Sequence, residues 1–185
     1  MPTTAKGGAT YEDLCALPEN VVGEIIHGDL TATPRPSARH GIAASVLGSE
    51  ILGPFQLGKG GPGGWWIIDE PELHLSPHVL VPDIAGWRKE RMPVPPEGHA
   101  IETVPDWICE VLSERTVQTD RIRKMPLYAE LGVMHLWLVD PEARTLEVFR
   151  REESRWLLLS AHAGDERVRA EPFGEIELEL ALLWS

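Results

Sequence analysis

Two apolar, strand-like segments of the chain each hold a carboxylate near their centre. Asp83 lies within segment 79–85 (VLVPDIA), and Glu110 lies within segment 107–112 (WICEVL). An ionised carboxylate is rarely buried without a partner, because its desolvation is costly, and two such acids on neighbouring strands would also repel each other. A divalent cation between them would relieve both problems, and ligands that are all oxygen favour Mg²⁺ or Mn²⁺ over zinc. The alternative is that each acid lies at a strand end and contacts water or an arginine.

The remaining patterns alternate between short strands and helices. A hairpin over 21–33 with a turn at Gly28-Asp29 is followed by strand patterns at 65–68, 135–139, 145–149 and 156–160. Helical patterns cover 10–17, 38–52 and 116–131, with Pro126 expected to kink the last one, and residues 175–184 fit a strand or a short helix. These elements predict an α/β (α+β) fold, with helices on the faces of a mixed sheet.

Length and composition predict a single folded domain over residues 1–185, with residues 1–9 as a flexible tail. The chain is 43% hydrophobic and 25% charged, as is usual for a globular protein. No apolar run is long enough to cross a membrane, no signal-peptide core is visible, and only Cys15 and Cys109 could form a disulfide. The glycine-rich segment 58–64 lacks the Lys-Ser/Thr ending of a P-loop. We therefore expect a cytoplasmic protein with no membrane partner and no organic cofactor.

The net charge limits how the chain could meet nucleic acid. Asp and Glu number 29 against 17 Lys and Arg, which gives a net charge of -12. This balance argues against loose coating of nucleic acid, because such binding needs a broad positive face. It does not exclude a nucleic-acid enzyme, since metal ions held by carboxylates supply positive charge locally.

Asp120 and Lys124 lie four residues apart in the helical pattern 116–131 and so share one face of the helix. One interpretation is a surface salt bridge with little effect on stability. The other is that Lys124 reaches back over the sheet toward the carboxylates of Asp83 and Glu110.

These motifs together resemble the Uma-type restriction endonuclease family of the PD-(D/E)xK nuclease superfamily. The matching residues are Tyr11-Glu-Asp-Leu, Glu24-Ile-Ile-His-Gly28, Pro34 to His40, Pro82-Asp83, Glu110-Val-Leu-Ser113, Asp120 to Lys124, and Tyr128 to Pro141. The resemblance covers about residues 10–142. It implies a restriction-endonuclease-like core, in which a central mixed sheet is flanked by helices and the acids project from two central strands. One motif departs from the superfamily, because Leu112 stands where it places a lysine, and Lys124 on the next helix would take that role.

The resemblance also implies a chemistry, the metal-dependent hydrolysis of DNA phosphodiester bonds. Asp83 and Glu110 would hold Mg²⁺ or Mn²⁺ with the backbone carbonyl of Val111, while Lys124 would orient the attacking water or stabilise the transition state. Further site residues would be Glu24 as a metal or water ligand, His40 near the phosphate or behind the metal, and Asp120.

A homodimer would supply two active sites for the two strands of a duplex. Two alternatives stay open: a non-catalytic interaction protein that keeps the nuclease fold, and a metal-dependent hydrolase of a small phosphorylated substrate.

Overall fold

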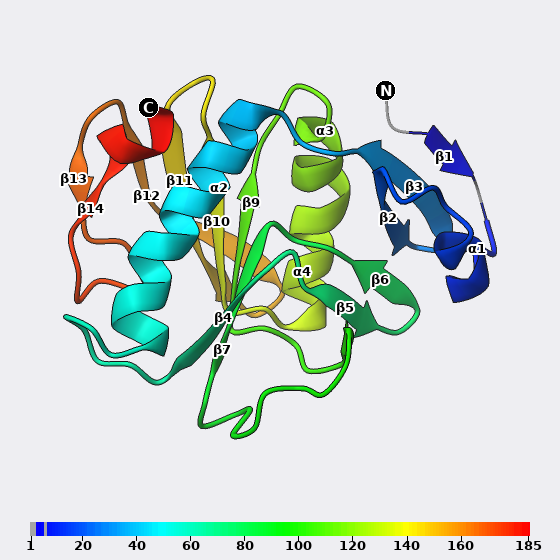
Figure 1. Ribbon diagram of the computed structural model, residues 1–185, viewed down its shortest axis with the longest axis horizontal. Coiled ribbons are helices and arrows are strands. Elements are labelled where there is room, and N and C mark those ends of the chain that lie inside the picture. The colour runs from blue at the N-terminus through cyan, green and yellow to red at the C-terminus, as the bar shows by residue number, and fades with distance from the viewer. Residues whose placement is uncertain (1–2, 6) are drawn as a thin grey trace.

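A mixed six-stranded sheet forms the centre of the molecule (Figure 1). This computed structural model describes residues 3–5 and 7–185. The strand order is β12-β11-β10-β9-β7-β4, and the strands are β4 (Trp65–Asp69), β7 (Ile84–Arg88), β9 (Trp107–Val111), β10 (His135–Asp140), β11 (Thr145–Glu152) and β12 (Arg155–Ala163). The central pair β9 and β10 is parallel and the other neighbours are antiparallel. The predicted α/β fold with a central mixed sheet is confirmed.

A second six-stranded sheet contains the predicted N-terminal hairpin. Its order is β1-β3-β2-β6-β5-β8, with β1 (Thr3–Ala5), β2 (Val21–Ile26), β3 (Asp29–Pro34), β5 (Glu72–Leu75), β6 (His78–Leu80) and β8 (Ala100–Ile101). The hairpin β2–β3 closes where Ile26 pairs with Asp29. The expected tail is corrected in part, because Thr3–Ala5 pair with β3. Residues 1, 2 and 6 of that expected tail lie outside the described residues.

Helices cover the two faces of the central sheet. On one face, α2 (Ala38–Ile51) buries Ala43, Leu47 and Ile51 against Trp107 and other core residues. On the other, α4 (Met125–Leu131) buries Leu127 and Tyr128 against the opposite side of the same strands. The short helix α1 (Tyr11–Cys15) is capped by Thr10, as predicted, but ends two residues earlier than expected. Successive residues of a strand point to opposite faces, so both sides of β9 are buried.

Two helices differ from the sequence prediction around their prolines. The helix expected to stop at Gly53-Pro54 continues as a π-helical turn, η1 (Leu52–Gln56). The pattern 116–131 contains α3 (Val117–Thr119), the π-helical turn η2 (Asp120–Lys124) and α4, and Pro126 lies in the first turn of α4. Pro126 has no N–H to donate within a helix, and the π-helical turn η2, where the regular helical hydrogen bonding is interrupted, lies directly before α4.

The segment 79–85 is not one strand, as the sequence analysis expected. It divides into the end of β6 in the second sheet and the start of β7 in the central sheet, with Val81–Asp83 between them. Pro82 cannot donate to a strand ladder, which explains the interruption. Asp83 therefore lies at the crossing between the two sheets, directly before β7, and β7 pairs with β9 as the sequence analysis expected.

The C-terminal region resolves the ambiguity over 175–184. It forms a two-stranded sheet of β13 (Arg167–Val168) and β14 (Leu178–Glu179), and then the 3-10 helix η3 (Leu180–Trp184). Phe173, Leu180 and Leu183 join the core beneath α2. Of the helices in residues 3–5 and 7–185, none has the length and apolar character needed to cross a bilayer.

Candidate active site

Glu110 is the most deeply placed acid of the site. It belongs to β9 at the centre of the main sheet, and its side chain shares a face with Ile108, toward α4. Only 3% of its surface is exposed. Because its desolvation is costly, this carboxylate needs polar partners, and the helical segment that covers the strand provides them.

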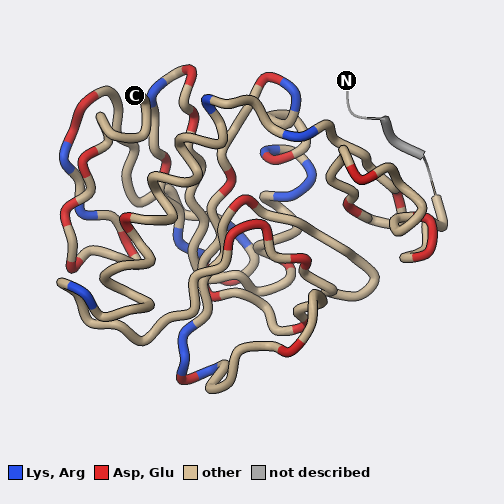
Figure 2. Tube along the Cα trace, in the orientation of Figure 1, with Lys and Arg blue, Asp and Glu red and all other residues tan. Residues whose placement is uncertain are grey.

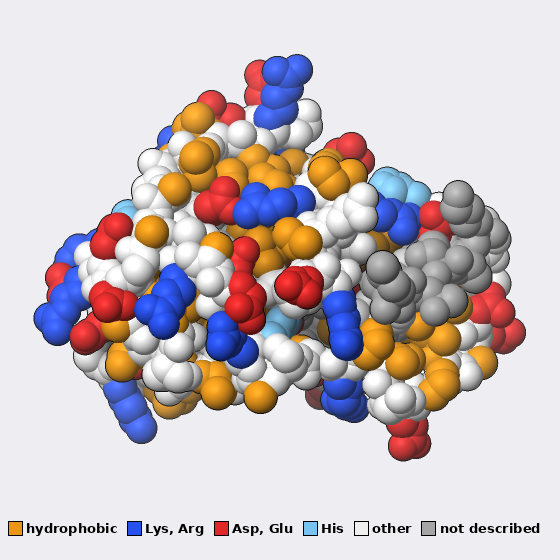
Figure 3. Space-filling view, turned by 90° about the horizontal axis from the view of Figure 1, so that it is seen from above, with side chains coloured by type: hydrophobic (Ala, Val, Ile, Leu, Met, Phe, Trp, Pro, Cys, Tyr) orange, Lys and Arg blue, Asp and Glu red, His pale blue; other side chains and the backbone are white. Residues whose placement is uncertain are grey.

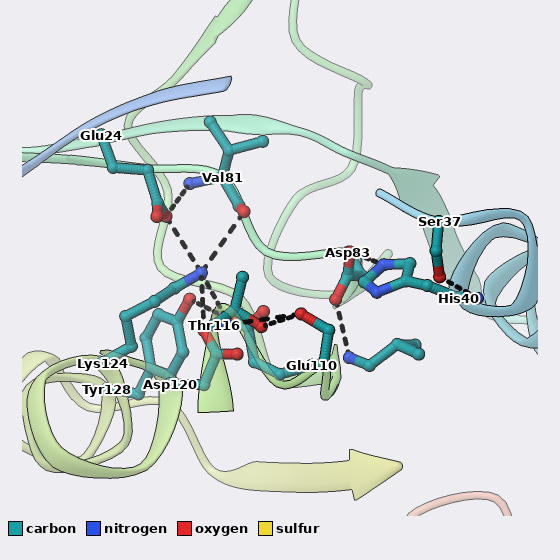
Figure 4. Close-up of polar contacts among 12 residues, drawn as sticks. Glu24, Ser37, His40, Val81, Asp83, Glu110, Thr116, Asp120, Lys124 and Tyr128 are labelled. Carbon is teal, nitrogen blue, oxygen red and sulfur yellow. Dashed lines mark hydrogen bonds and ion pairs between the residues drawn. The ribbon is translucent and has the colours of Figure 1, made fainter. Parts of the chain in front are cut away.

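Lys124, on the π-helical turn η2, provides that partner (Figure 4). Its Nζ lies 2.7 Å from Oε1 of Glu110 and 3.0 Å from Oε1 of Glu24. The same atom lies 3.8 Å from Oδ1 of Asp120 and donates to the carbonyl of Val81 at 3.4 Å. Burial alone lowers the pKa of Lys124, but the carboxylates of Glu110 and Glu24 outweigh it and raise the pKa well above its usual value. The side chain is therefore an ammonium at neutral pH.

Three carboxylates contact the ammonium of Lys124, and burial raises the pKa of two of them, Glu110 and Asp120. Burial raises the pKa of Glu110 well above its usual value; Lys124 opposes this in part, while the neighbouring acids add to it. Burial likewise raises the pKa of Asp120 to about 6, again against the effect of Lys124. Both shifts favour the protonated, neutral form of these acids in the metal-free protein.

Tyr128 and Val81 hold Glu110 and Glu24, the two acids that lie nearest to Nζ of Lys124. The hydroxyl of Tyr128, one helical turn beyond Lys124, donates to Oε1 of Glu110 at 2.5 Å. Glu24, on β2, accepts the backbone N–H of Val81 at 2.9 Å. The ion pairs thus tie together the second sheet, the central sheet and the helix that covers them.

Asp83 forms a second polar group next to this cluster. Its Oδ1 lies 2.7 Å from Nε2 of His40, and its Oδ2 accepts the backbone N–H of Val111 at 2.6 Å. His40 belongs to the first turn of α2, which Ser37 caps by accepting the N–H of His40. Burial lowers the pKa of His40, but the hydrogen bond to Asp83 and the charges of nearby carboxylates together outweigh it, so the net direction is upward. Nδ1 of His40 is buried and has no hydrogen-bonding partner among the described residues.

One cavity of about 390 Å³ joins the two groups. The predicted site residues that line it are Glu24, His40, Asp83, Glu110, Asp120 and Lys124. Val111 reaches the site through its N–H to Asp83. Asp120 and Lys124 are 4% and 3% exposed, so their interpretation as a surface salt bridge is wrong.

Tyr128 is the site residue that the sequence analysis missed. It lies four residues after Lys124 and eight after Asp120, so all three lie on one face of the helical segment. This spacing places Tyr128 on the same helical face as two charged residues. It was the sequence signal that could have predicted Tyr128 as a site residue.

The donor set fits a divalent cation of the magnesium class. No three Asp, Glu, His or Cys side chains in residues 3–5 and 7–185 converge into a ready-made metal cage. Mg²⁺ is commonly bound by only one or two carboxylates and keeps several waters, so Asp83 and Glu110 are enough side-chain ligands. Burial makes the charged forms of Glu110 and Asp120 costly, as their raised pKa values indicate, and a bound cation would offset this cost.

Comparison with known proteins identifies the family and the fold of the chain. Residues 9–182 match the Uma2 family, described as "Putative restriction endonuclease". The chain belongs to the Uma2 family. No curated protein matches it. Among solved structures, it is similar to a "putative nuclease belonging to DUF820" from Anabaena variabilis, with 23% sequence identity and a TM-score of 0.75 over 95% of this chain and 97% of that one. This similarity shows that the Uma2 chain has the fold of that protein.

Proposed function

We propose that this Uma2 protein is a cytoplasmic hydrolase, a metal-dependent endonuclease that cleaves DNA phosphodiester bonds. The observation that supports it best is that three carboxylates, Glu24, Glu110 and Asp120, surround the buried ammonium of Lys124 in the cavity that Asp83 also lines. Such a cluster suits a divalent cation and an anionic substrate, whose charges complement each other.

Asp83 and Glu110 would hold Mg²⁺ or Mn²⁺, together with the backbone carbonyl of Val111. When bound, the ion polarises the scissile phosphate and lowers the pKa of a coordinated water. His40 holds Asp83 from behind at 2.7 Å, and Tyr128 holds Glu110 at 2.5 Å. Partners of this kind orient the ligating side chains and keep their geometry rigid.

Lys124 acts as a proton-bearing cation in this scheme. Its raised pKa leaves it protonated, so it donates hydrogen bonds and does not serve as the general base. It orients the attacking water or stabilises the negative charge that develops on the phosphate. Glu24 holds the ammonium at 3.0 Å and would be a further water or metal ligand.

The test is metal-dependent cleavage of plasmid DNA. We expect cleavage in Mg²⁺ or Mn²⁺ but not in EDTA, and a loss of about 100-fold or more in Asp83→Asn and Glu110→Gln. Asp165→Asn is the matched control, because Asp165 is exposed and does not line the cavity. Cleavage that survives in both site variants would contradict the assignment.

The same assay separates the alternatives. Cleavage of bis(p-nitrophenyl) phosphate without cleavage of DNA would favour a small phosphorylated substrate. No metal-dependent cleavage of either compound would favour a non-catalytic interaction protein. We also propose a homodimer, in which two sites act on the two strands of a duplex, and sedimentation analysis tests it.

A further inference from the structure

To bind DNA as proposed, this acidic chain has few basic side chains available for the phosphates. Its net charge is -12, and acidic residues are spread along the whole trace (Figure 2). Several arginines are already engaged in ion pairs away from the cavity, namely Arg91 with Asp106, Arg121 with Glu147, Arg123 with Asp29, Arg150 with Glu171 and Arg167 with Glu179. Among them are Arg121 and Arg123 on the site helix, which do not line the cavity and whose ion pairs are less exposed than that of Arg39.

Three exposed arginines line the cavity instead, namely Arg35, Arg39 and Arg115. We call them the arginine rim. Arg35 directly follows β3, Arg39 lies in the first turn of α2, and Arg115 lies in the loop between β9 and α3. Figure 3 looks onto this face, where basic and acidic side chains are mixed. The side chain of Arg115 has no hydrogen-bonding or ion-pair partner within the part of the chain that the structure describes.

Arg39 differs from the other two arginines because an acid of the cavity holds it. Its Nη1 lies 2.8 Å from Oε2 of Glu142, and both residues line the cavity. Glu142 follows β10 in a turn whose backbone is fixed, since Oδ1 of Asp140 accepts the N–H groups of Glu142 and Ala143, each at 2.9 Å. The ion pair therefore joins α2 to the β10–β11 turn.

This ion pair is easily exchanged. The side chains of Arg39 and Glu142 are 58% and 63% exposed, and exposed ion pairs contribute little to stability. A phosphate offers a guanidinium the same bidentate geometry as a carboxylate. A substrate phosphate can therefore replace Glu142 on Arg39 without disturbing the core.

We propose that the arginine rim binds the DNA backbone next to the carboxylate site, and that Glu142 competes with a substrate phosphate for Arg39. The inference rests on the proposed function and deepens it: Arg39 is a positioning residue, and Glu142 weakens binding in the free protein. Glu142 thereby limits non-productive capture of nucleic acid by an otherwise uncovered arginine.

The experiment measures binding of fluorescein-labelled duplex DNA by anisotropy in Ca²⁺, with cleavage followed separately in Mg²⁺. Removing a competing exposed ion pair should tighten binding by up to about fivefold in Glu142→Gln. Arg39→Gln should weaken binding and reduce the salt slope by about 0.9, the contribution of one phosphate contact. The double variant should bind no more tightly than Arg39→Gln alone, because Glu142 then has nothing to compete for.

Arg167→Gln is the matched control, since Arg167 is an exposed arginine paired with Glu179 outside the cavity. Binding by Glu142→Gln that is equal to or weaker than wild type would overturn the inference. So would an Arg39→Gln effect no larger than that of Arg167→Gln, or the absence of DNA binding in all variants. Binding that follows the expected order without any cleavage would contradict the proposed function alone.

Discussion

At the scale of single residues, Lys124 supplies the positive charge that contacts the buried carboxylates of Glu110, Glu24 and Asp120. Its ammonium lies within 4 Å of Glu110, Glu24 and Asp120 (3.8 Å at most) and is almost fully buried. Buried charges are tolerated only when they are paired, and breaking such a pair leaves an uncompensated charge in the core. The stability of the metal-free protein should therefore depend strongly on this one side chain.

Replacing Lys124 with methionine tests this dependence. Lys124→Met keeps the length of the side chain but removes the ammonium, so we expect a loss of about 3–5 kcal/mol in the free energy of unfolding at pH 7 without metal. Urea denaturation measures the loss, and Lys59→Met, at an exposed lysine in the loop after η1, is the control with an expected change below about 0.5 kcal/mol. Equal small effects in the two variants would show that Lys124 compensates nothing.

Asp120 predicts a pH dependence of stability. Its pKa is raised to about 6 in the folded state, compared with about 3.9 in an unfolded chain. The folded state therefore keeps a proton that the unfolded state has lost. The group favours folding at low pH, and this contribution falls as pH rises from about 4 to 6, by at most about 3 kcal/mol in total.

Asp120→Asn removes this titration. Between pH 4 and pH 7 without metal, the stability of the variant relative to wild type should rise, whatever its offset at low pH. Urea denaturation across this range checks the slope. Parallel stability profiles for the two proteins would contradict the raised pKa.

At the scale of elements, hydrophobic patterns predicted most of the strands and helices but not their interruptions. The hairpin over 21–33, the strand that contains Glu110 and the helix that contains Lys124 all form where expected. The break at Val81–Asp83 and the π-helical turn η2 were not predicted, because both depend on how the chain crosses between packed layers. A proline lies near each interruption, Pro82 at the first and Pro126 at the second, and only Pro126 was expected to disturb its element, by a kink.

The N-terminal cap of α2 positions a residue of the site. Ser37 accepts the N–H of His40, and His40 in turn holds Asp83. We expect Ser37→Ala to lower the free energy of unfolding by about 1 kcal/mol through loss of the cap, and Ser37→Asn to retain most of it because asparagine also caps helices. Chemical denaturation of the three proteins measures both values. An alanine variant as stable as wild type would show that the cap is not formed.

At the scale of the whole molecule, the site is assembled from segments that are far apart in the chain. Asp120 and Lys124 could be paired from their spacing, and the family resemblance implied roles for Asp83, Glu110, Glu24 and His40. The contact between Glu24 and Lys124 could not be derived from spacing, since it requires the second sheet to pack beside η2. Nor could the pairing of Arg39 with Glu142, which are separated by 103 residues.

The surplus of carboxylates over cations in this assembled site leads to the central claim, that Asp83 and Glu110 bind a divalent cation. Thermal unfolding with and without millimolar Mg²⁺ or Mn²⁺ tests it most directly, in wild type, Asp83→Asn and the control Asp165→Asn. At ten times the dissociation constant, binding adds about 1.4 kcal/mol, which raises the Tm by about 3–6 °C for a chain of this length. We predict that rise in wild type and Asp165→Asn and none in Asp83→Asn. An equal rise in all three proteins, or none in wild type at saturating metal, would contradict the metal site.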